Sequence, residues 1–330
     1  MASAYSPEQI STYLKHIKLP QKYHAENQAS YPHNLAFLAA LHVHTISTIP
    51  YENLSIHYSS NRKISLDPQH LFQKIVGGGR GRGGYCMENS ILFNHILRGL
   101  GFEVYTAGVR VRLRENGVPS GTYIGWVHIV NIVTLPCGAK YMLDVGFGGD
   151  GAINPVPLIP GHVVPNIGQQ DVRLIRDHIP QQVDKSEKTK LWIYQYRNGN
   201  NKAWNSFYAF PEVEFLEEDF KVMNWYTGNS PMSFQTYTIL IVKFLRRLKD
   251  DSGEEEVYGK RMLVNGTVKE NLGGSTKVVE ECQTENERVQ ALRKWFGITL
   301  TEEEKRSIVG HCTELKVPIL NGMPKGNGGT

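Results

Sequence analysis

The segment RGGYCMENSILF, residues 82–93, joins a glycine-rich run to a predicted helix. The run GGGRGRGG, residues 77–84, interrupts regular structure, whereas apolar side chains recur at helical spacing over residues 86–100. Cys86 therefore lies at the N-terminus of this predicted helix. There, unpaired N–H groups and the helix dipole favour the thiolate, which is the nucleophilic form, and are suited to hold an oxyanion. A buried, inert thiol is the alternative and the more common state of a free cysteine.

The glycine-rich run has several interpretations. It contains no GxxxxGK[ST] pattern, which excludes a P-loop. Arg-Gly pairs occur in RNA-binding tails, but those tails are long, and this run is short and lies between two apolar helices. The run is therefore either a solvated loop or a tight turn in which the backbone closely approaches a ligand or another strand.

On either side of this segment, the predicted secondary structure divides the chain into three parts. The first hundred residues are predicted to be helical, with helices opening at Ser6-Pro7 and Asp67-Pro68 and a further one over residues 34–49. The middle third is mostly β, with strands predicted at 102–113, 126–135 and 140–147. The last third mixes both types. Its signals are a buried strand at 237–245, a hairpin at Asn265-Gly266, and capping boxes at Thr284–Glu287 and Thr301–Glu304.

Two polar residues lie in the apolar strands of the middle third. His128 falls in WVHIVNIV and Asp144 in YMLDVGFG. A buried carboxylate is costly unless it is paired, and an imidazole that donates to it satisfies both groups and orients the ring. Each residue alone is more often structural. Together with Cys86 they match the pattern of a nucleophile, a base and an orienting acid.

The connection between the two strands decides whether His128 and Asp144 meet. With a two-residue turn at 137–138, residue 128 would lie opposite residue 147, and Asp144 would point to the other face. A loop with an odd number of residues, such as 136–138, pairs 128 with 146 and places both side chains on one face; a bulge would do the same. We therefore expect an odd loop or a bulge.

Composition narrows the class of protein. The 330 residues include 36 basic and 32 acidic side chains, a net charge of +4, which is too small to indicate nucleic acid or a membrane surface as the main partner. No run of 18 apolar residues indicates a membrane span, and MASAYSPEQ does not resemble a secretory signal. The four cysteines, at 86, 137, 282 and 312, form no CxxC pair, so we expect no disulfide scaffold, no metal site and a cytoplasmic location.

Four motifs, in order along the chain, resemble the arylamine N-acetyltransferase family. These are IPYENLSIHY at 49–58, with Tyr51 where the family motif has Phe; RGGYC at 82–86; WVHIV with YMLDVGFGG at 126–130 and 141–149; and DFKVMNWYTGNSPMSFQ at 219–235. The resemblance extends from about residue 5 to residue 300. The chain departs from the family at Tyr51, at Met87-Glu88 and in an enlarged stretch between Gly151 and Trp192, differences that bear on substrate range.

The resemblance implies an α+β fold in three parts around a cysteine-protease-like core. These are a helical bundle over residues 1–100, a β-barrel over 101–215 and an α/β lid over 216–330. It implies a catalytic triad of Cys86, His128 and Asp144. The activity it implies is ping-pong transfer of an acetyl or malonyl group from acyl-coenzyme A to an aromatic amine or hydrazine, in the detoxification of foreign compounds. The coenzyme A thioester is a substrate, with no permanently bound cofactor. We expect a monomer or weak dimer with no nucleic-acid or membrane partner.

The motifs also indicate supporting residues. Gly125, Tyr226 and Ser233 are the candidates for contact with coenzyme A. Arg82 and Glu52 are expected to form an ion pair near the active-site turn; the alternative is two independent surface charges. The alternating Arg110, Arg112 and Arg114 either neutralise coenzyme A phosphates or form the solvated face of a half-buried strand.

Two other classes of function are compatible with the sequence. A papain- or transglutaminase-like cysteine amidohydrolase uses the same triad, but it would cut amides rather than take an acyl group from coenzyme A. An RNA-binding module would use the Arg-Gly segment; it predicts salt-dependent RNA affinity and an ordinary Cys86 thiol.

Overall fold

The N-terminal third is helical, as predicted. A computed structural model describes residues 2–24, 30–249 and 253–316. The elements of this third are α1 (Pro7–His16), η1 (Gln21–Tyr23), α2 (Leu35–Thr48), β1 (Tyr51–Glu52), α3 (Leu54–His57), α4 (Pro68–Phe72), η3 (Gln73–Gly77) and α5 (Cys86–Gly99). The predicted caps are confirmed, since the side chains of Ser6 and Asp67 accept hydrogen bonds from the first turns of α1 and α4. Helix α5 begins at Cys86.

The middle third is a curled antiparallel sheet. Its strands are β2 (Glu103–Glu115), β3 (Val118–Thr134), β4 (Lys140–Leu143), β5 (Val156–Pro157), β6 (Val163–Pro165), β7 (Gln170–Asp177), β8 (Leu191–Asn198) and β9 (Asn205–Phe210), with η4 (Glu187–Thr189) between β7 and β8. They lie in the order β5-β4-β3-β2-β9-β8-β7-β6, and β5 contacts β7 across the opening, so the sheet nearly closes into a barrel.

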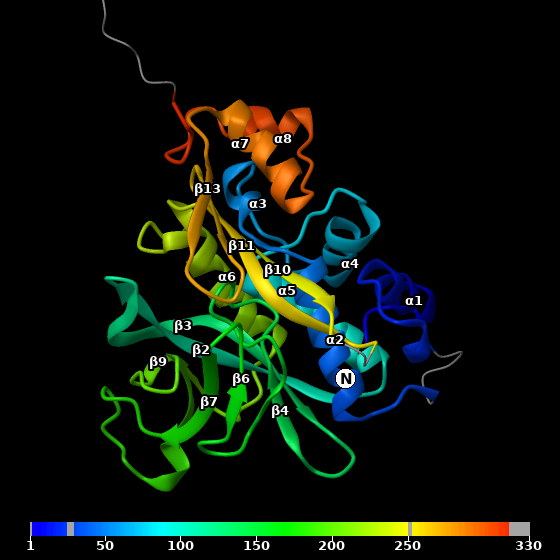
Figure 1. Ribbon diagram of the computed structural model, residues 1–330, viewed down its shortest axis with the longest axis vertical. Coiled ribbons are helices and arrows are strands. Elements are labelled where there is room, and N and C mark those ends of the chain that lie inside the picture. The colour runs from blue at the N-terminus through cyan, green and yellow to red at the C-terminus, as the bar shows by residue number, and fades with distance from the viewer. Residues whose placement is uncertain (1, 25–29, 250–252, 317–330) are drawn as a thin grey trace, which may run out of the picture.

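The last third builds a second sheet and the remaining helices. Its elements are α6 (Glu217–Asn229), η5 (Phe234–Thr236), β10 (Leu240–Leu248), β11 (Glu255–Val264), β12 (Thr267–Asn271), β13 (Lys277–Glu281), α7 (Glu285–Ala291), η6 (Leu292–Phe296) and α8 (Glu302–Ser307). The sheet order is β1-β10-β11-β12-β13, so its edge strand comes from the N-terminal third. In Figure 1 the barrel lies at the bottom, α7 and α8 at the top, and β10 and β11 cross between them.

The hairpin between β3 and β4 has the register that the sequence predicted. Thr134 pairs with Lys140, and the Leu135 N–H donates to the Ala139 carbonyl at 2.9 Å, which leaves the odd loop 136–138. The predicted strand end at residue 147 is wrong, since β4 ends at Leu143. The chain turns there because the Asp144 carboxylate accepts a hydrogen bond from the Gly146 N–H at 3.1 Å.

Other local signals are confirmed and a few elements were not predicted. The Asn265-Gly266 hairpin joins β11 to β12, with Asn265 at φ 53°, and both capping boxes form at α7 and α8. The strand predicted at 237–245 is β10, shifted toward the C-terminus. Helix α6 and strand β1 were missed. Within the described residues, no helix combines the length and apolar character that crossing a bilayer requires.

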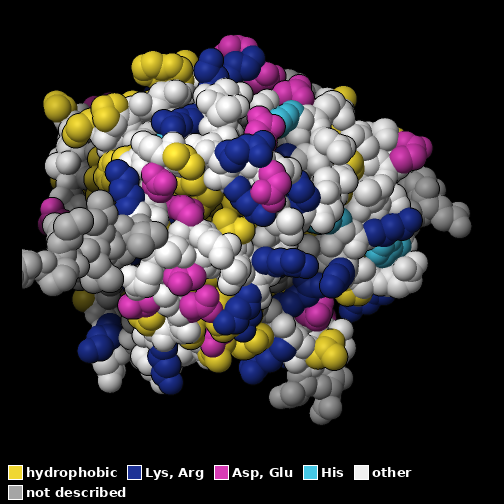
Figure 2. All heavy atoms as spheres, turned by 90° about the horizontal axis from the view of Figure 1, so that it is seen from above, with side chains coloured by type: hydrophobic (Ala, Val, Ile, Leu, Met, Phe, Trp, Pro, Cys, Tyr) yellow, Lys and Arg dark blue, Asp and Glu magenta, His cyan; other side chains and the backbone are white. Residues whose placement is uncertain are grey.

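On the face seen from the α7–α8 end, Lys and Arg are interspersed with Asp and Glu (Figure 2). That face therefore does not present the field of a single sign that attracts a polyanion.

Candidate active site

Cys86 lies at the first position of α5 and is 4% exposed. Its thiol lies 3.8 Å from the Val127 carbonyl, the residue before His128. The turn that delivers it is tight: a Cβ on Gly83 would lie 1.9 Å from the Pro50 carbonyl oxygen. The second half of the glycine-rich run, Gly81 to Gly84, is thus a packed turn, because only glycine permits these approaches, whereas Gly77 to Gly79 are exposed.

His128 and Asp144 form the predicted contact. The His128 Nε2 lies 2.8 Å from an Asp144 carboxylate oxygen, and the two residues are 4% and 2% exposed. The Phe147 ring packs beside the imidazole with centroids 5.0 Å apart. Because Asp144 binds Nε2, Nδ1 is the ring nitrogen left to exchange a proton with another group.

Gly146 brings the Asp144 loop onto the nucleophile. A Cβ at Gly146 would lie 2.8 Å from the Cα of Cys86, so only a glycine lets this loop pass directly over the start of α5. The structure therefore brings Cys86, His128 and Asp144 together from three elements: a helix start, a strand and the turn that follows the next strand.

Burial and charge oppose a thiolate at Cys86. Burial raises the pKa of the Cys86 thiol, the Asp144 carboxylate raises it further, and hydrogen bonds from the backbone N–H groups of Met87 and Cys86 lower it. The thiol therefore stays protonated unless a neighbouring base accepts its proton. His128, whose Nε2 is held by Asp144, remains the predicted base.

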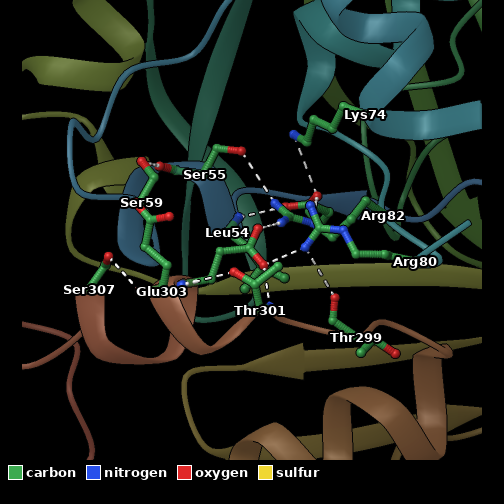
Figure 3. A network of polar contacts seen from close by, with 12 residues as sticks. Leu54, Ser55, Ser59, Lys74, Arg80, Arg82, Thr299, Thr301, Glu303 and Ser307 are labelled. Atoms are coloured by element: carbon green, nitrogen blue, oxygen red, sulfur yellow. Dashed lines mark hydrogen bonds and ion pairs between the residues drawn. The ribbon is translucent and has the colours of Figure 1, made fainter. Parts of the chain in front are cut away.

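A buried ion-pair network supports the turn (Figure 3). Arg82 Nε donates to Glu52 at 2.9 Å, which confirms the expected pair, and Lys74 lies 3.6 Å from the same carboxylate. Burial alone would raise the pKa of Glu52, but Arg82 and Lys74 outweigh it and hold the pKa below its ordinary value. Glu52 also accepts the Leu54 N–H at 2.7 Å, so every charge in this cluster has a partner.

Two acidic residues of the network were missed by the sequence analysis. Glu88 accepts the Tyr85 N–H at 3.0 Å and the Lys74 ammonium at 2.7 Å. Glu304, on α8, binds both Arg80 and Arg82. The sequence identified Glu304 only as part of the capping box with Thr301. No residue near Glu304 in the sequence indicates that α8 packs against the turn before Cys86.

The coenzyme A candidates lie on different elements. Gly125 is exposed on β3, and Tyr226 is 41% exposed on α6. Ser233 is buried, and its hydroxyl donates to the Thr227 carbonyl at 2.7 Å. Helix α6 packs against the residue before Cys86, since Tyr85 and Thr227 share a 3.0 Å hydrogen bond between their hydroxyl groups. The contacts with coenzyme A remain predictions.

Arg110, Arg112 and Arg114 all contact other residues of the protein. Arg110 lies over the Trp126 ring at 4.0 Å, Arg112 donates to the Gly121 carbonyl at 3.0 Å, and Arg114 pairs with Asp150 at 2.5 Å. These contacts favour the structural interpretation of the stripe. Among the described residues, no group of three or more His, Cys, Asp or Glu side chains is placed to hold a metal ion.

A small cavity lies between the Asp144 loop and the second sheet. Its lining comprises Ile46, Ile49, Tyr51, Asp144, Val145, Phe147, Gly148, Val242 and Phe244. Asp144 and Tyr51 are the two lining residues with polar side chains.

Sequence comparisons identify relatives over almost the full length. A family model described as N-acetyltransferase matches residues 34–305. An N-malonyltransferase FDB2 of Fusarium pseudograminearum is 36% identical over 323 residues, covering 92% of each chain. An arylamine N-acetyltransferase of Escherichia coli is 31% identical over 213 residues, covering 64% of this chain and 67% of that one.

Solved structures share the fold. The arylamine N-acetyltransferases of Mycobacterium abscessus and Salmonella typhimurium both give a TM-score of 0.73, at 22% and 23% identity. They cover 93% and 92% of this chain, and the match covers 95% and 98% of theirs. The Mycobacterium marinum enzyme in complex with CoA gives 0.68 at 23% identity, covering 92% of this chain and 99% of that one. The predicted three-part α+β architecture is therefore that of these enzymes.

Proposed function

Because this chain belongs to the arylamine N-acetyltransferase family, we propose that it transfers an acyl group from an acyl-coenzyme A to an aromatic amine or hydrazine through an acyl-cysteine at Cys86. The observation that supports the proposal is the 2.8 Å contact between His128 and Asp144, next to a buried Cys86 whose thiol lies 3.8 Å from the carbonyl of Val127, the residue before His128. Relatives named N-malonyltransferase and arylamine N-acetyltransferase support acyl transfer to nitrogen.

The first half-reaction acylates the enzyme. His128 Nδ1 accepts the Cys86 proton, and the thiolate attacks the thioester carbonyl. Backbone N–H groups at the start of α5 hold the tetrahedral oxyanion. The intermediate collapses, the carbon–sulfur bond to coenzyme A breaks, and the imidazolium returns its proton to the departing sulfur. Asp144 stabilises the imidazolium and fixes the ring orientation.

The second half-reaction releases the product. The amine nitrogen attacks the acyl-cysteine carbonyl, His128 takes the proton of that nitrogen, and the Cys86 sulfur leaves as thiolate. The enzyme returns to its starting state as the thiolate recovers the proton. Burial raises the pKa of the Cys86 thiol, so its deprotonation depends on a base within the site.

A donor panel tests this function. Acetyl-, propionyl- and malonyl-coenzyme A are each assayed for release of coenzyme A thiol, with and without an arylamine. We expect one equivalent of thiol per enzyme without acceptor, continuous turnover with it, and an acyl adduct on Cys86 by mass spectrometry. Cys86→Ala should release none. Thiol release that persists in this variant, or amide hydrolysis without acylation by any thioester, would contradict the proposal.

We also propose an oligomeric state, a cellular location and a coenzyme A site for the enzyme. It acts as a monomer or weak dimer in the cytoplasm, on a coenzyme A thioester and a small amine, with Gly125, Tyr226 and Ser233 at the coenzyme A site. The exposed ring of Tyr226 on α6, the helix that packs on Tyr85, supports this placement.

A further inference from the structure

One face of the second sheet covers the loop that carries Asp144. Tyr51 of β1 pairs with Val242 of β10, and Val242 pairs with Met262 of β11, so the three side chains share a face. A Cβ on Gly148 would lie 3.6 Å from the Val242 side chain, and one on Gly149 would lie 3.2 Å from the Met262 sulfur. This face therefore closes the small cavity beside the proposed triad, with Tyr51 in its wall.

The backbone of Tyr51 is fixed to the turn that precedes the nucleophile. Tyr51 forms a β-bridge with Gly84, and the Glu52 N–H donates to the Gly84 carbonyl at 2.9 Å. Burial raises the pKa of Tyr51, and the negative charge of a Cys86 thiolate raises it further. The phenol of Tyr51 therefore keeps its proton and can act as a hydrogen-bond donor in the wall of the cavity that Asp144 also lines.

A chain of hydrogen bonds decides which way that proton points. The Leu240 N–H donates to Asn53 Oδ1 at 2.9 Å, so the amide nitrogen of Asn53 faces Gln235 and donates to its Oε1 at 2.9 Å. Gln235 must then present its own nitrogen to Tyr51, and it donates to the phenol oxygen at 2.5 Å. The phenol oxygen is an acceptor in this bond, so its O–H is left to donate elsewhere.

We propose that the Tyr51 O–H donates a hydrogen bond to the free carboxylate of a malonyl group carried by Cys86, and so selects malonyl over acetyl donors. This inference rests on the proposed function. The acetyl methyl takes the place of the malonyl methylene and carries only hydrogen where the malonyl group carries its carboxylate, so only the malonyl group offers an acceptor beyond the thioester carbonyl. A bond to an ionised oxygen is stronger than a neutral one, and a buried donor left unpaired is penalised. Tyr51 is thus a specificity-determining residue.

Two further observations fit a carboxylate in this region. Behind the same loop, the two cations Lys260 and Arg114 share one carboxylate, that of Asp150, which leaves a surplus of positive charge. Lys260 pairs with Phe244, which lines the cavity, and its ammonium donates to the Gly149 carbonyl. The similarity to an N-malonyltransferase of Fusarium pseudograminearum agrees with a donor that carries a carboxylate.

The test is Tyr51→Phe, which removes one oxygen and restores the residue of the family motif. Single-turnover release of coenzyme A is measured with malonyl- and acetyl-coenzyme A on the same preparation. We expect acylation by malonyl-coenzyme A to fall about 10–100-fold, the range of a hydrogen bond to a charged group, and acylation by acetyl-coenzyme A to change by less than about threefold. Tyr13→Phe is the matched control. It removes a buried phenol bonded to Thr45 at 2.7 Å in the helical bundle and should leave both rates unchanged.

Each other outcome overturns the inference. An equal loss with both donors would make Tyr51 part of the thioester chemistry common to them. No loss with either donor, or a wild-type enzyme that accepts acetyl- but not malonyl-coenzyme A, would remove its role in selection. Failure of the proposed function is distinct, because the wild-type chain would then release no thiol from any donor.

Discussion

Cys86 lies at the N-terminus of α5, where a nucleophile is expected, but burial and the Asp144 carboxylate both raise the pKa of its thiol. A raised thiol pKa means that the protonated form persists to higher pH than in a free cysteine, whose pKa is about 8.5. Reactivity at neutral pH must therefore come from proton transfer to His128. Cys137 and Cys312 are exposed, and the buried Cys282 has no imidazole that the mechanism assigns to it.

The first prediction concerns the rate of alkylation of Cys86 by iodoacetamide, measured by mass spectrometry from pH 6 to 10. In a background with Cys137→Ser and Cys312→Ser, we expect Cys86 to react well before Cys282 at pH 7, although burial raises the pKa of both thiols. His128→Asn should slow Cys86 at least tenfold at pH 7 and move its inflection above about 8.5. Unchanged alkylation in this variant would show that His128 does not accept the proton.

The second prediction concerns Asp144→Asn. The amide oxygen can still accept the Gly146 N–H, so the turn should hold and the melting temperature should change little. Because an amide cannot stabilise the imidazolium at His128, single-turnover acylation should fall about 10³–10⁴-fold, as in other triads. The alkylation rate of Cys86 at pH 7 should fall in parallel. Near-normal acylation would reduce the mechanism to a Cys86–His128 dyad.

Among the helices and strands, the sequence predicted those features that depend on contacts between residues close in the chain. The caps at Ser6 and Asp67 and the odd loop at 136–138 depend on residues close in sequence, and each formed as expected. Strand β1 was not predictable in this way, because two residues become a strand only by pairing with β10, far along the chain. The predicted contact between Arg82 and Glu52 came from motifs, whereas Glu304 entered the same cluster from a distant helix.

The third prediction separates the members of the Arg82 cluster. Arg82→Met leaves the buried Glu52 with Lys74 alone, and breaking such a pair costs about 3–5 kcal/mol. Glu304→Gln should cost less, because Arg82 keeps Glu52. As a surface control, Arg247→Met removes an exposed pair with Glu256 worth about 1 kcal/mol at most. Urea unfolding measures all three; an Arg82→Met cost no larger than that of the control would show that the cluster is not what holds the turn.

The fourth prediction concerns how the stability that this cluster contributes changes with pH. Burial alone would raise the pKa of Glu304, but the Thr301 amide and the two arginines outweigh it, so the pKa is lowered, as it is for Glu52. A lowered folded-state pKa gives stability that is present above the unfolded value, about 4.3, and is lost as pH falls through the folded value. The melting temperature should therefore drop below about pH 4.3, and less steeply in Glu304→Gln. Equal slopes in both proteins would contradict this.

In the whole molecule, the three parts of the chain contribute side chains to the same hydrophobic cores. The core around Phe37 and Ile96 continues into the barrel at Ile129 and into the last third at Phe220 and Phe244. A second core packs Leu54 and Tyr58 against side chains from β10, β11 and the C-terminal helices. The proposed active site lies where these parts meet, so its geometry depends on all of them at once.

The last prediction is that the chain unfolds as one unit. Without residues 216–330, the N-terminal third loses the strand that pairs with β1, and the shared core loses Phe220, Val242 and Phe244. Fragment 1–215 should therefore lack a cooperative melt by circular dichroism, and the full chain should show one calorimetric transition with calorimetric and van't Hoff enthalpies nearly equal. Two resolved transitions, or a fragment that melts cooperatively, would mean that the segments 1–100, 101–215 and 216–330 behave as independent domains, and the triad would then depend on how they dock.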